Sequence, residues 1–171
     1  EEKNVSLLLK AFEVCLKHKS KIKLQIIGDG EEYAKLQMLV DELLIKEYVD
    51  FIPFLPQNIL NIHLARAKVS VLPSKCFETA SMLVFESTLC NVFPIVGDYG
   101  GMKEMVNYIG IGTTYEDGCK YDLSKKILTA LENFESYEPS FVLSRKKAFD
   151  LDIRSYAQKI EMIYKDLAES G

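Results

Sequence analysis

Residues 68–86 read KVSVLPSKCFETASMLVFE, and this stretch indicates the fold class of the chain. The run 68–72 is short, apolar and β-branched, which is typical of a buried strand, and a Pro-Ser pair ends it. Apolar residues then resume at helical spacing. Glu78 and Glu86, with seven residues between them, therefore flank a transition from strand to helix. Open α/β sheets bind ligands at this end of their strands, so both carboxylates are candidate ligand-binding groups.

The same alternation of strand and helix continues in both directions from this stretch. We predict strands over residues 22–27, 48–52, 68–72, 93–96 and 109–112, helices over 5–16, 31–46, 57–66, 79–90, 123–134, 139–149 and 153–168, and a short helix after the glycine pair 100–101. This order predicts an α/β fold with a Rossmann-like, doubly wound, mostly parallel sheet, helices on both faces and extra carboxyl-terminal helices. Because no linker or repeat divides the chain, we predict that residues 1–171 form a single domain.

The composition argues against several classes of protein. No stretch reaches the roughly 18 consecutive apolar residues of a membrane span. A net charge of −4, with the 21 basic residues spread along the chain, does not favour nucleic-acid binding. The four cysteines form no C-x-x-C pair and no ligand-spaced cluster with a histidine, which argues against zinc and against a disulfide scaffold. We expect a cytoplasmic protein, at most peripheral at the inner face of the membrane, with no cofactor and no metal.

Further segments complete a pattern together with the two spaced glutamates. They are residues 3–12 (KNVSLLLKAF), 24–30 (LQIIGDG), 71–74 (VLPS) and 100–104 (GGMKE). In this order and spacing they resemble the nucleotide-sugar domain of retaining GT-B glycosyltransferases, the family of glycosyl transferases group 1. The resemblance spans residues 3–168. It implies that the chain is the donor-binding, carboxyl-terminal half of such an enzyme, facing a cleft that an amino-terminal domain would complete.

The resemblance also implies roles for individual residues. Glu78 matches the glutamate that contacts hydroxyls of the donor sugar, and we assign it as the catalytic residue. Glu86 matches the glutamate that holds the ribose, and Lys3 matches a lysine that neutralises the donor diphosphate. These roles agree with the chemistry of the groups, because an ionised carboxylate accepts the two hydrogen bonds that a vicinal diol donates. A lysine at a helix amino terminus adds its charge to the amide dipoles there, which suits a phosphate.

The chain departs from the family pattern at two places. The sequence Thr79-Ala80-Ser81 stands where the family usually has Gly-Phe-Gly or Ser-Phe-Gly after the first glutamate. We still assign all three residues to the donor site, since Ser81 offers an amide and a hydroxyl at a helix start. An arginine that precedes the family's lysine has no counterpart, and the first recognisable element is a helix. We therefore expect that a leading strand precedes Glu1 in the complete protein.

The implied function is transfer of a sugar, expected to be a hexose, from a nucleoside diphosphate to a hydroxyl of an acceptor sugar or glycolipid. Polysaccharide biosynthesis is the setting implied by the family, and the fragment alone is expected to be inactive because the acceptor binds to the other half. Other interpretations stay open. The chain could be a non-catalytic α/β interaction or regulatory domain, or half of a sugar-nucleotide epimerase. In the regulatory case Glu78 would only cap a helix and Glu86 would be a solvated surface acid.

Overall fold

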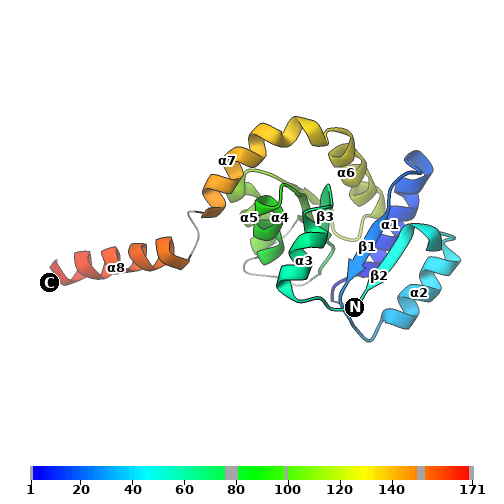
Figure 1. Cartoon of the computed structure of the whole chain (residues 1–171), viewed down its shortest axis with the longest axis horizontal. Helices are drawn as coiled ribbons and strands as arrows, with labels where there is room; N and C mark the ends of the chain where they lie inside the picture. Colours follow the sequence, from blue (N-terminus) through cyan, green and yellow to red (C-terminus); the bar gives the residue numbers. More distant parts are fainter. Residues whose placement is uncertain (1, 76–80, 99, 150–152, 170–171) are drawn as a thin grey trace.

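The computed structural model describes residues 2–75, 81–98, 100–149 and 153–169 (Figure 1). The elements in chain order are α1 (Val5–His18), β1 (Leu24–Ile27), α2 (Tyr33–Glu42), the 3-10 helix η1 (Lys46–Tyr48), β2 (Val49–Ile52), α3 (Gln57–Leu64), β3 (Val69–Leu72), α4 (Met82–Leu89), β4 (Phe93–Gly97), α5 (Gly100–Ile109), β5 (Thr113–Tyr115), α6 (Lys120–Glu132), η2 (Phe134–Tyr137), α7 (Glu138–Phe149) and α8 (Ile153–Glu169). Strands and helices alternate as the sequence predicts.

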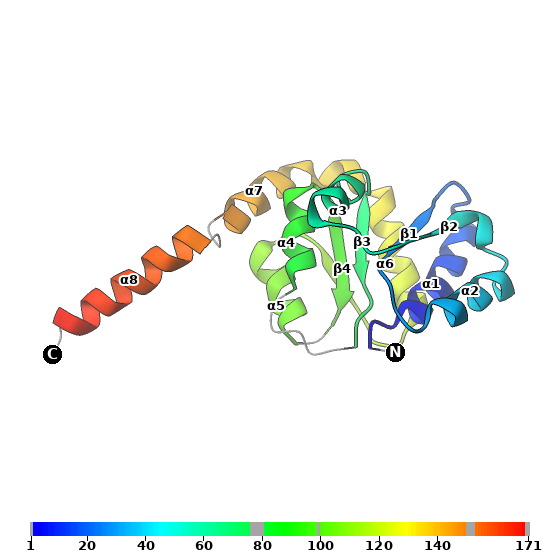
Figure 2. The ribbon, with the colours of Figure 1, turned by 60° about the horizontal axis from the view of Figure 1, so that its bottom comes forward.

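All of the strand pairs in the described residues are parallel, which confirms the predicted α/β class. Strand β1 pairs with β2, and a second sheet has the order β3-β4-β5. The single sheet expected from the sequence is thus divided into two (Figure 2). The two sheets share part of their packing, because Ile22 and Leu24 contact the apolar clusters of both.

Helix α1 connects the two cores. Leu7, Leu8, Ala11 and Cys15 belong to the larger cluster, which contains the buried strand β4, whereas Leu9 and Phe12 pack with residues of α2 and β2. The helix is therefore apolar around much of its circumference, as expected for a helix that is covered on more than one side. Its first residues consequently have a defined position, and Lys3 and Asn4 precede them directly.

The sequence-based prediction was wrong about the last strand. Helix α5 continues to Ile109, and the strand runs from Thr113 to Tyr115 rather than over 109–112. Gly110 and Gly112 connect them with φ angles of +84° and +108°, which favour glycine over residues with a side chain. At Gly112 a Cβ atom would lie 2.7 Å from the carbonyl oxygen of Pro94, so only glycine fits this connection beside β4.

Several helix boundaries also differ from the prediction by a few residues. Helix α2 ends at Glu42 instead of residue 46, because Leu44 adopts a left-handed conformation with a φ of +57°. Helix α4 begins at Met82, because Ser81 is its extended N-cap residue, and the part of the prediction that covers residues 79 and 80 lies outside the described residues.

The last helix, α8, extends away from the rest of the domain (Figures 1 and 2). It carries exposed apolar side chains, among them Tyr156, Met162, Ile163 and Tyr164. Over the described ranges, each helix is too short or too polar to cross a membrane.

Candidate functional site

Glu86 lies on α4, the helix that follows β3, and its carboxylate is half-buried. The helix packs on the sheet through buried Val84, Ser87 and Thr88, so Glu86 occupies the boundary between this face and solvent. The Nε2 of Gln57 donates a hydrogen bond to its Oε1 at 3.0 Å. Burial raises the pKa of Glu86 above its ordinary value, and the bond from Gln57 opposes part of this rise. Glu86 is thus a fixed carboxylate at the edge of the domain.

Gln57 is the first residue of α3, and the loop before it is anchored to the turn that follows β1. The Oδ2 of Asp29 accepts a hydrogen bond from the backbone N–H of Phe54 at 2.9 Å, and the N–H of Gly28 bonds the carbonyl of Ile52 at 2.9 Å. The Phe54 ring remains exposed. The turn after β1 is therefore bonded to the loop after β2, and this loop leads into Gln57, which contacts Glu86.

Lys3 lies beside the carboxyl end of β3. The carbonyl of Glu2 accepts hydrogen bonds from the backbone N–H of Lys75 at 2.8 Å and from the Oγ of buried Ser74 at 3.4 Å. These bonds bring the start of α1 to the segment that leads toward the helix of Glu86. The Lys3 side chain is exposed, while Asn4 behind it is buried and adopts a left-handed conformation with a φ of 48°.

Ser81 is the N-cap residue of α4 and is almost completely buried. Its carbonyl accepts a hydrogen bond from the N–H of Val84 at 3.2 Å, and its side chain does not cap the helix. The hydroxyl is therefore not used in the manner typical of a capping serine. Glu78, Thr79 and Ala80, the remaining predicted site residues, lie outside the described residues.

The residue after β4 and the first turn of α5 carry a charged pair. The Nζ of Lys103 lies 2.8 Å from the Oδ1 of Asp98, and both side chains are partly exposed. The hydrogen bond from Lys103 lowers the pKa of Asp98, with a smaller contribution from Thr114. Gly100 begins α5 with a φ of +58°, a conformation that favours glycine, so the helix starts at the glycine pair rather than after it.

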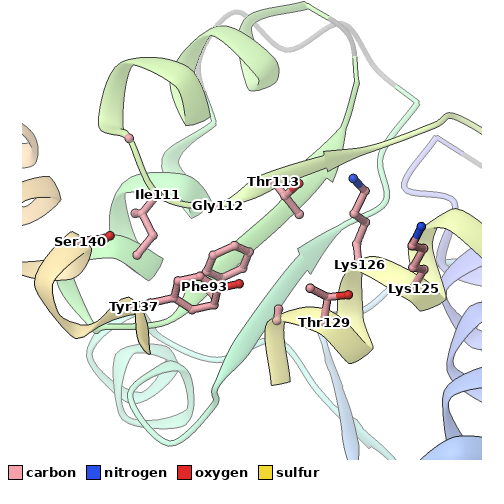
Figure 3. A pocket seen from close by; sticks show the side chains of 11 residues that line it. Phe93, Ile111, Gly112, Thr113, Lys125, Lys126, Thr129, Tyr137 and Ser140 are labelled. Carbon is pink, nitrogen blue, oxygen red and sulfur yellow. The ribbon is translucent and has the colours of Figure 1, made fainter. Parts of the chain in front are cut away.

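A cavity of about 440 Å³ lies at the opposite, amino-terminal ends of β4 and β5 (Figure 3). Phe93 and Tyr137 stack on each other inside it, with ring centroids 4.4 Å apart, and Lys125 and Lys126 line it from α6. None of the predicted site residues that the structure describes lines this cavity. Its position separates it from Glu86, Lys3 and Ser81, and it belongs to no part of the predicted donor site.

Sequence reasoning missed Gln57 and Asn4. Gln57 contacts Glu86 across 29 positions of sequence, and no local pattern marks that contact. Asn4 is buried next to Lys3, and its Nδ2 has no hydrogen-bond partner among the described residues. The signal available for Asn4 was its place just before an apolar helix, where asparagine commonly caps. The structure shows no such side-chain cap.

The described residues include groups suited to a polyhydroxylated anion. A half-buried carboxylate can accept hydrogen bonds from a diol, and a lysine next to a helix amino terminus can contact a phosphate. In the ranges that the structure describes, no three His, Cys, Asp or Glu side chains gather closely enough to hold a metal ion.

Comparison with known proteins gives a family for the chain. The family model described as glycosyl transferases group 1 matches residues 1–139. HepE from Anabaena, solved in complex with UDP, superposes with a TM-score of 0.83 at 20% identity, over 96% of this chain and 46% of HepE. A glycosyltransferase from Rickettsia africae gives 0.84 at 17% identity, over 100% of this chain and 46% of that one. The catalytic domain of cholesterol-α-glucosyltransferase from Helicobacter pylori gives 0.75 at 23% identity, over 89% and 92% of the two chains. No curated protein matches the sequence.

The solved structures share less than a quarter of their residues with this chain, and their likeness establishes the fold alone. The chain spans less than half the length of HepE and of the Rickettsia protein. The family match is independent of this likeness, and it covers Lys3, Gln57, Ser81 and Glu86. The chain therefore belongs to glycosyl transferases group 1, and its fold is that of a GT-B carboxyl-terminal domain.

Proposed function

We propose that this chain is the donor-binding half of a retaining glycosyltransferase, which transfers a sugar from a nucleoside diphosphate to an acceptor hydroxyl. In this proposal Glu86 holds the ribose, Lys3 and the start of α1 bind the diphosphate, and Thr79, Ala80 and Ser81 complete the donor site. Glu78 is the proposed catalytic residue, which contacts hydroxyls of the donor sugar.

The observation that carries the proposal is a pair of contacts made by the segment after β3, one with the first residue of α3 and one with the start of α1. The half-buried carboxylate of Glu86 is held by Gln57, and the start of α1 is bonded to Ser74 and Lys75. Burial disfavours the ionised form of this carboxylate on α4. Hydrogen bonds from a ligand's hydroxyls would offset that cost.

The chemistry of the site fits a diphosphate leaving group. Cleavage of the sugar–oxygen bond leaves negative charge on the nucleoside diphosphate. A lysine ammonium next to the amide dipoles of a helix start stabilises that charge electrostatically, which lowers the barrier to departure. Among the solved neighbours, HepE has been crystallised with UDP, with UDP and glucose, and with UDP-glucose. Because of these complexes, UDP is the first nucleotide to test.

The proposal also assigns acceptor binding to another part of the enzyme. An acceptor sugar or glycolipid would bind to the amino-terminal half of the enzyme, so we expect the fragment alone to be inactive. Hexosyl transfer in polysaccharide biosynthesis, on the cytoplasmic side of the membrane, is the proposed setting.

The experiment is an isothermal titration of the chain with UDP, GDP and ADP, and with their sugar conjugates. From half of a cleft we expect a dissociation constant on the order of 0.1 to 1 mM for one nucleotide. Glu86→Gln should weaken binding of that nucleotide by about tenfold or more, because the amide replaces one acceptor oxygen with a donor and removes the charge.

Glu132→Gln is the matched control. Glu132 is the exposed last residue of α6, at the amino-terminal end of the sheet, and this variant should bind as the wild type does. The proposal fails for this chain if no nucleotide binds at 10 mM, or if the two glutamate variants bind equally well.

A further inference from the structure

The side-chain amide of Gln57 has both of its hydrogens engaged. Its Nε2 lies 3.0 Å from the Oε1 of Glu86 and 3.0 Å from the Oδ1 of Asn61, one turn further along α3. Both partners are acceptors, and a glutamine NH₂ group has two hydrogens to donate. Turning the amide over would place its oxygen against these two oxygens. Only one orientation of Gln57 therefore fits, and the contact with Glu86 has a defined geometry.

This contact restricts the Glu86 carboxylate before any ligand is present. A glutamate on a helix surface normally samples several rotamers, and binding must select one of them. Here one lone pair of Oε1 is occupied by Gln57, whereas the second oxygen accepts no hydrogen bond from the residues that the structure describes. The donated bond also favours the ionised carboxylate, which is the stronger acceptor.

We propose that Gln57 is a positioning residue, which holds the Glu86 carboxylate in the orientation that accepts hydrogen bonds from both hydroxyls of the nucleotide ribose. This inference rests on the proposed function, in which Glu86 binds the ribose. Gln57 acts through Glu86 rather than on the ligand, so its contribution depends on the presence of the ribose hydroxyls.

That dependence gives a test that a merely structural role would not pass. The three nucleotides UDP, GDP and ADP are each titrated beside their 2′,3′-dideoxy analogues, into the wild type, Gln57→Ala and Glu86→Gln. Gln57 is exposed and alanine is well tolerated in a helix, so Gln57→Ala should keep the melting temperature of the wild type. Gln37→Ala is the control, because Gln37 makes a comparable exposed contact with the hydroxyl of Tyr33 at 2.9 Å on α2.

We expect the wild type to prefer the ribonucleotide over its dideoxy analogue. Gln57→Ala should weaken binding of the ribonucleotide by about five- to tenfold, which lies within the range for loss of one typical hydrogen bond. The affinity of this variant for the dideoxy analogue should stay within about twofold of the wild-type affinity. Glu86→Gln should remove the preference, and Gln37→Ala should change neither affinity.

The possible failures are distinguishable. If Gln57→Ala weakens binding of both nucleotides of a pair equally, Gln57 supports the loop before α3 rather than the Glu86 carboxylate, and the inference is overturned. If Gln57→Ala keeps the wild-type preference while Glu86→Gln loses it, the inference is overturned and the proposed role of Glu86 stands. A wild type that binds both forms equally, or binds none, overturns the role of Glu86 and the inference with it.

Discussion

At the scale of single residues, Glu86 links binding to stability. Because burial raises its pKa, the folded protein holds this proton more tightly than the unfolded chain does. Between the ordinary value of 4.5 and the raised value, the free energy of unfolding therefore decreases as the pH rises. Above this window the ionised Glu86 carries the full cost of its partial burial.

Glu86→Gln removes that cost, and its carbonyl oxygen can still accept the bond from Gln57. We expect the variant to melt at a higher temperature than the wild type at about pH 7, although it binds nucleotide more weakly. The difference should vanish below pH 4.5, where the carboxyl is protonated in both states. Differential scanning calorimetry across this range measures the effect. A lower melting temperature for the variant at neutral pH would show that the ionised carboxylate stabilises the free protein.

At the scale of the elements, a buried hydroxyl pair fixes α4 on the sheet. The Oγ atoms of Ser70 on β3 and Ser87 on α4 lie 2.7 Å apart, and both residues are buried. Ser87 follows Glu86 directly, so this contact sets the rotation of the helix that carries the carboxylate. Ser87→Ala should lower the free energy of unfolding by about 1–2 kcal/mol, because it leaves the hydroxyl of Ser70 unsatisfied.

The double variant Ser70→Ala with Ser87→Ala should cost less than the sum of the two single variants, since it leaves neither hydroxyl alone. Urea denaturation of the four proteins closes this cycle. Strictly additive losses would indicate that the two hydroxyls do not depend on each other.

At the scale of the whole molecule, α8 stands apart from the core. The buried apolar clusters that the structure describes extend to α7, through Phe141 and Ala148, and include no residue of α8. Removal of residues 150–171 should therefore change the melting temperature by less than about 2 °C, a shift that corresponds to at most about 1 kcal/mol for a domain of this size. It should also reduce self-association, because it removes exposed apolar side chains such as Tyr156 and Tyr164.

Truncation after Tyr137 is the comparison for this experiment. It also removes Phe141 and Ala148 from the core, and it should lower the melting temperature by many degrees. Equal melting temperatures for the two truncations would mean that α7 contributes nothing to the core.

The sequence alone determined the class of fold and the place of the candidate site along the chain. The recurrence of apolar residues every two or every 3.6 positions is a local property of the sequence. The β3–α4 segment and the helix that follows Lys3 were therefore predicted from neighbouring residues. The short strand β5 was missed because the sequence TTY has little periodicity of its own. It is ordered by pairing with β4, where Ile95 aligns with Thr113.

Only the tertiary structure decided which residues meet. The bond between Gln57 and Glu86 spans 29 positions, and the bond from Ser74 to the carbonyl of Glu2 spans 72. The division into two sheets likewise depends on how distant strands pair. Such contacts arise when separate elements pack. The position of a helix in the packed structure then decides which residue its polar side chains contact. A local pattern contains no information about a residue that chain folding brings near, which is why the sequence marked Glu86 as a candidate and did not mark Gln57.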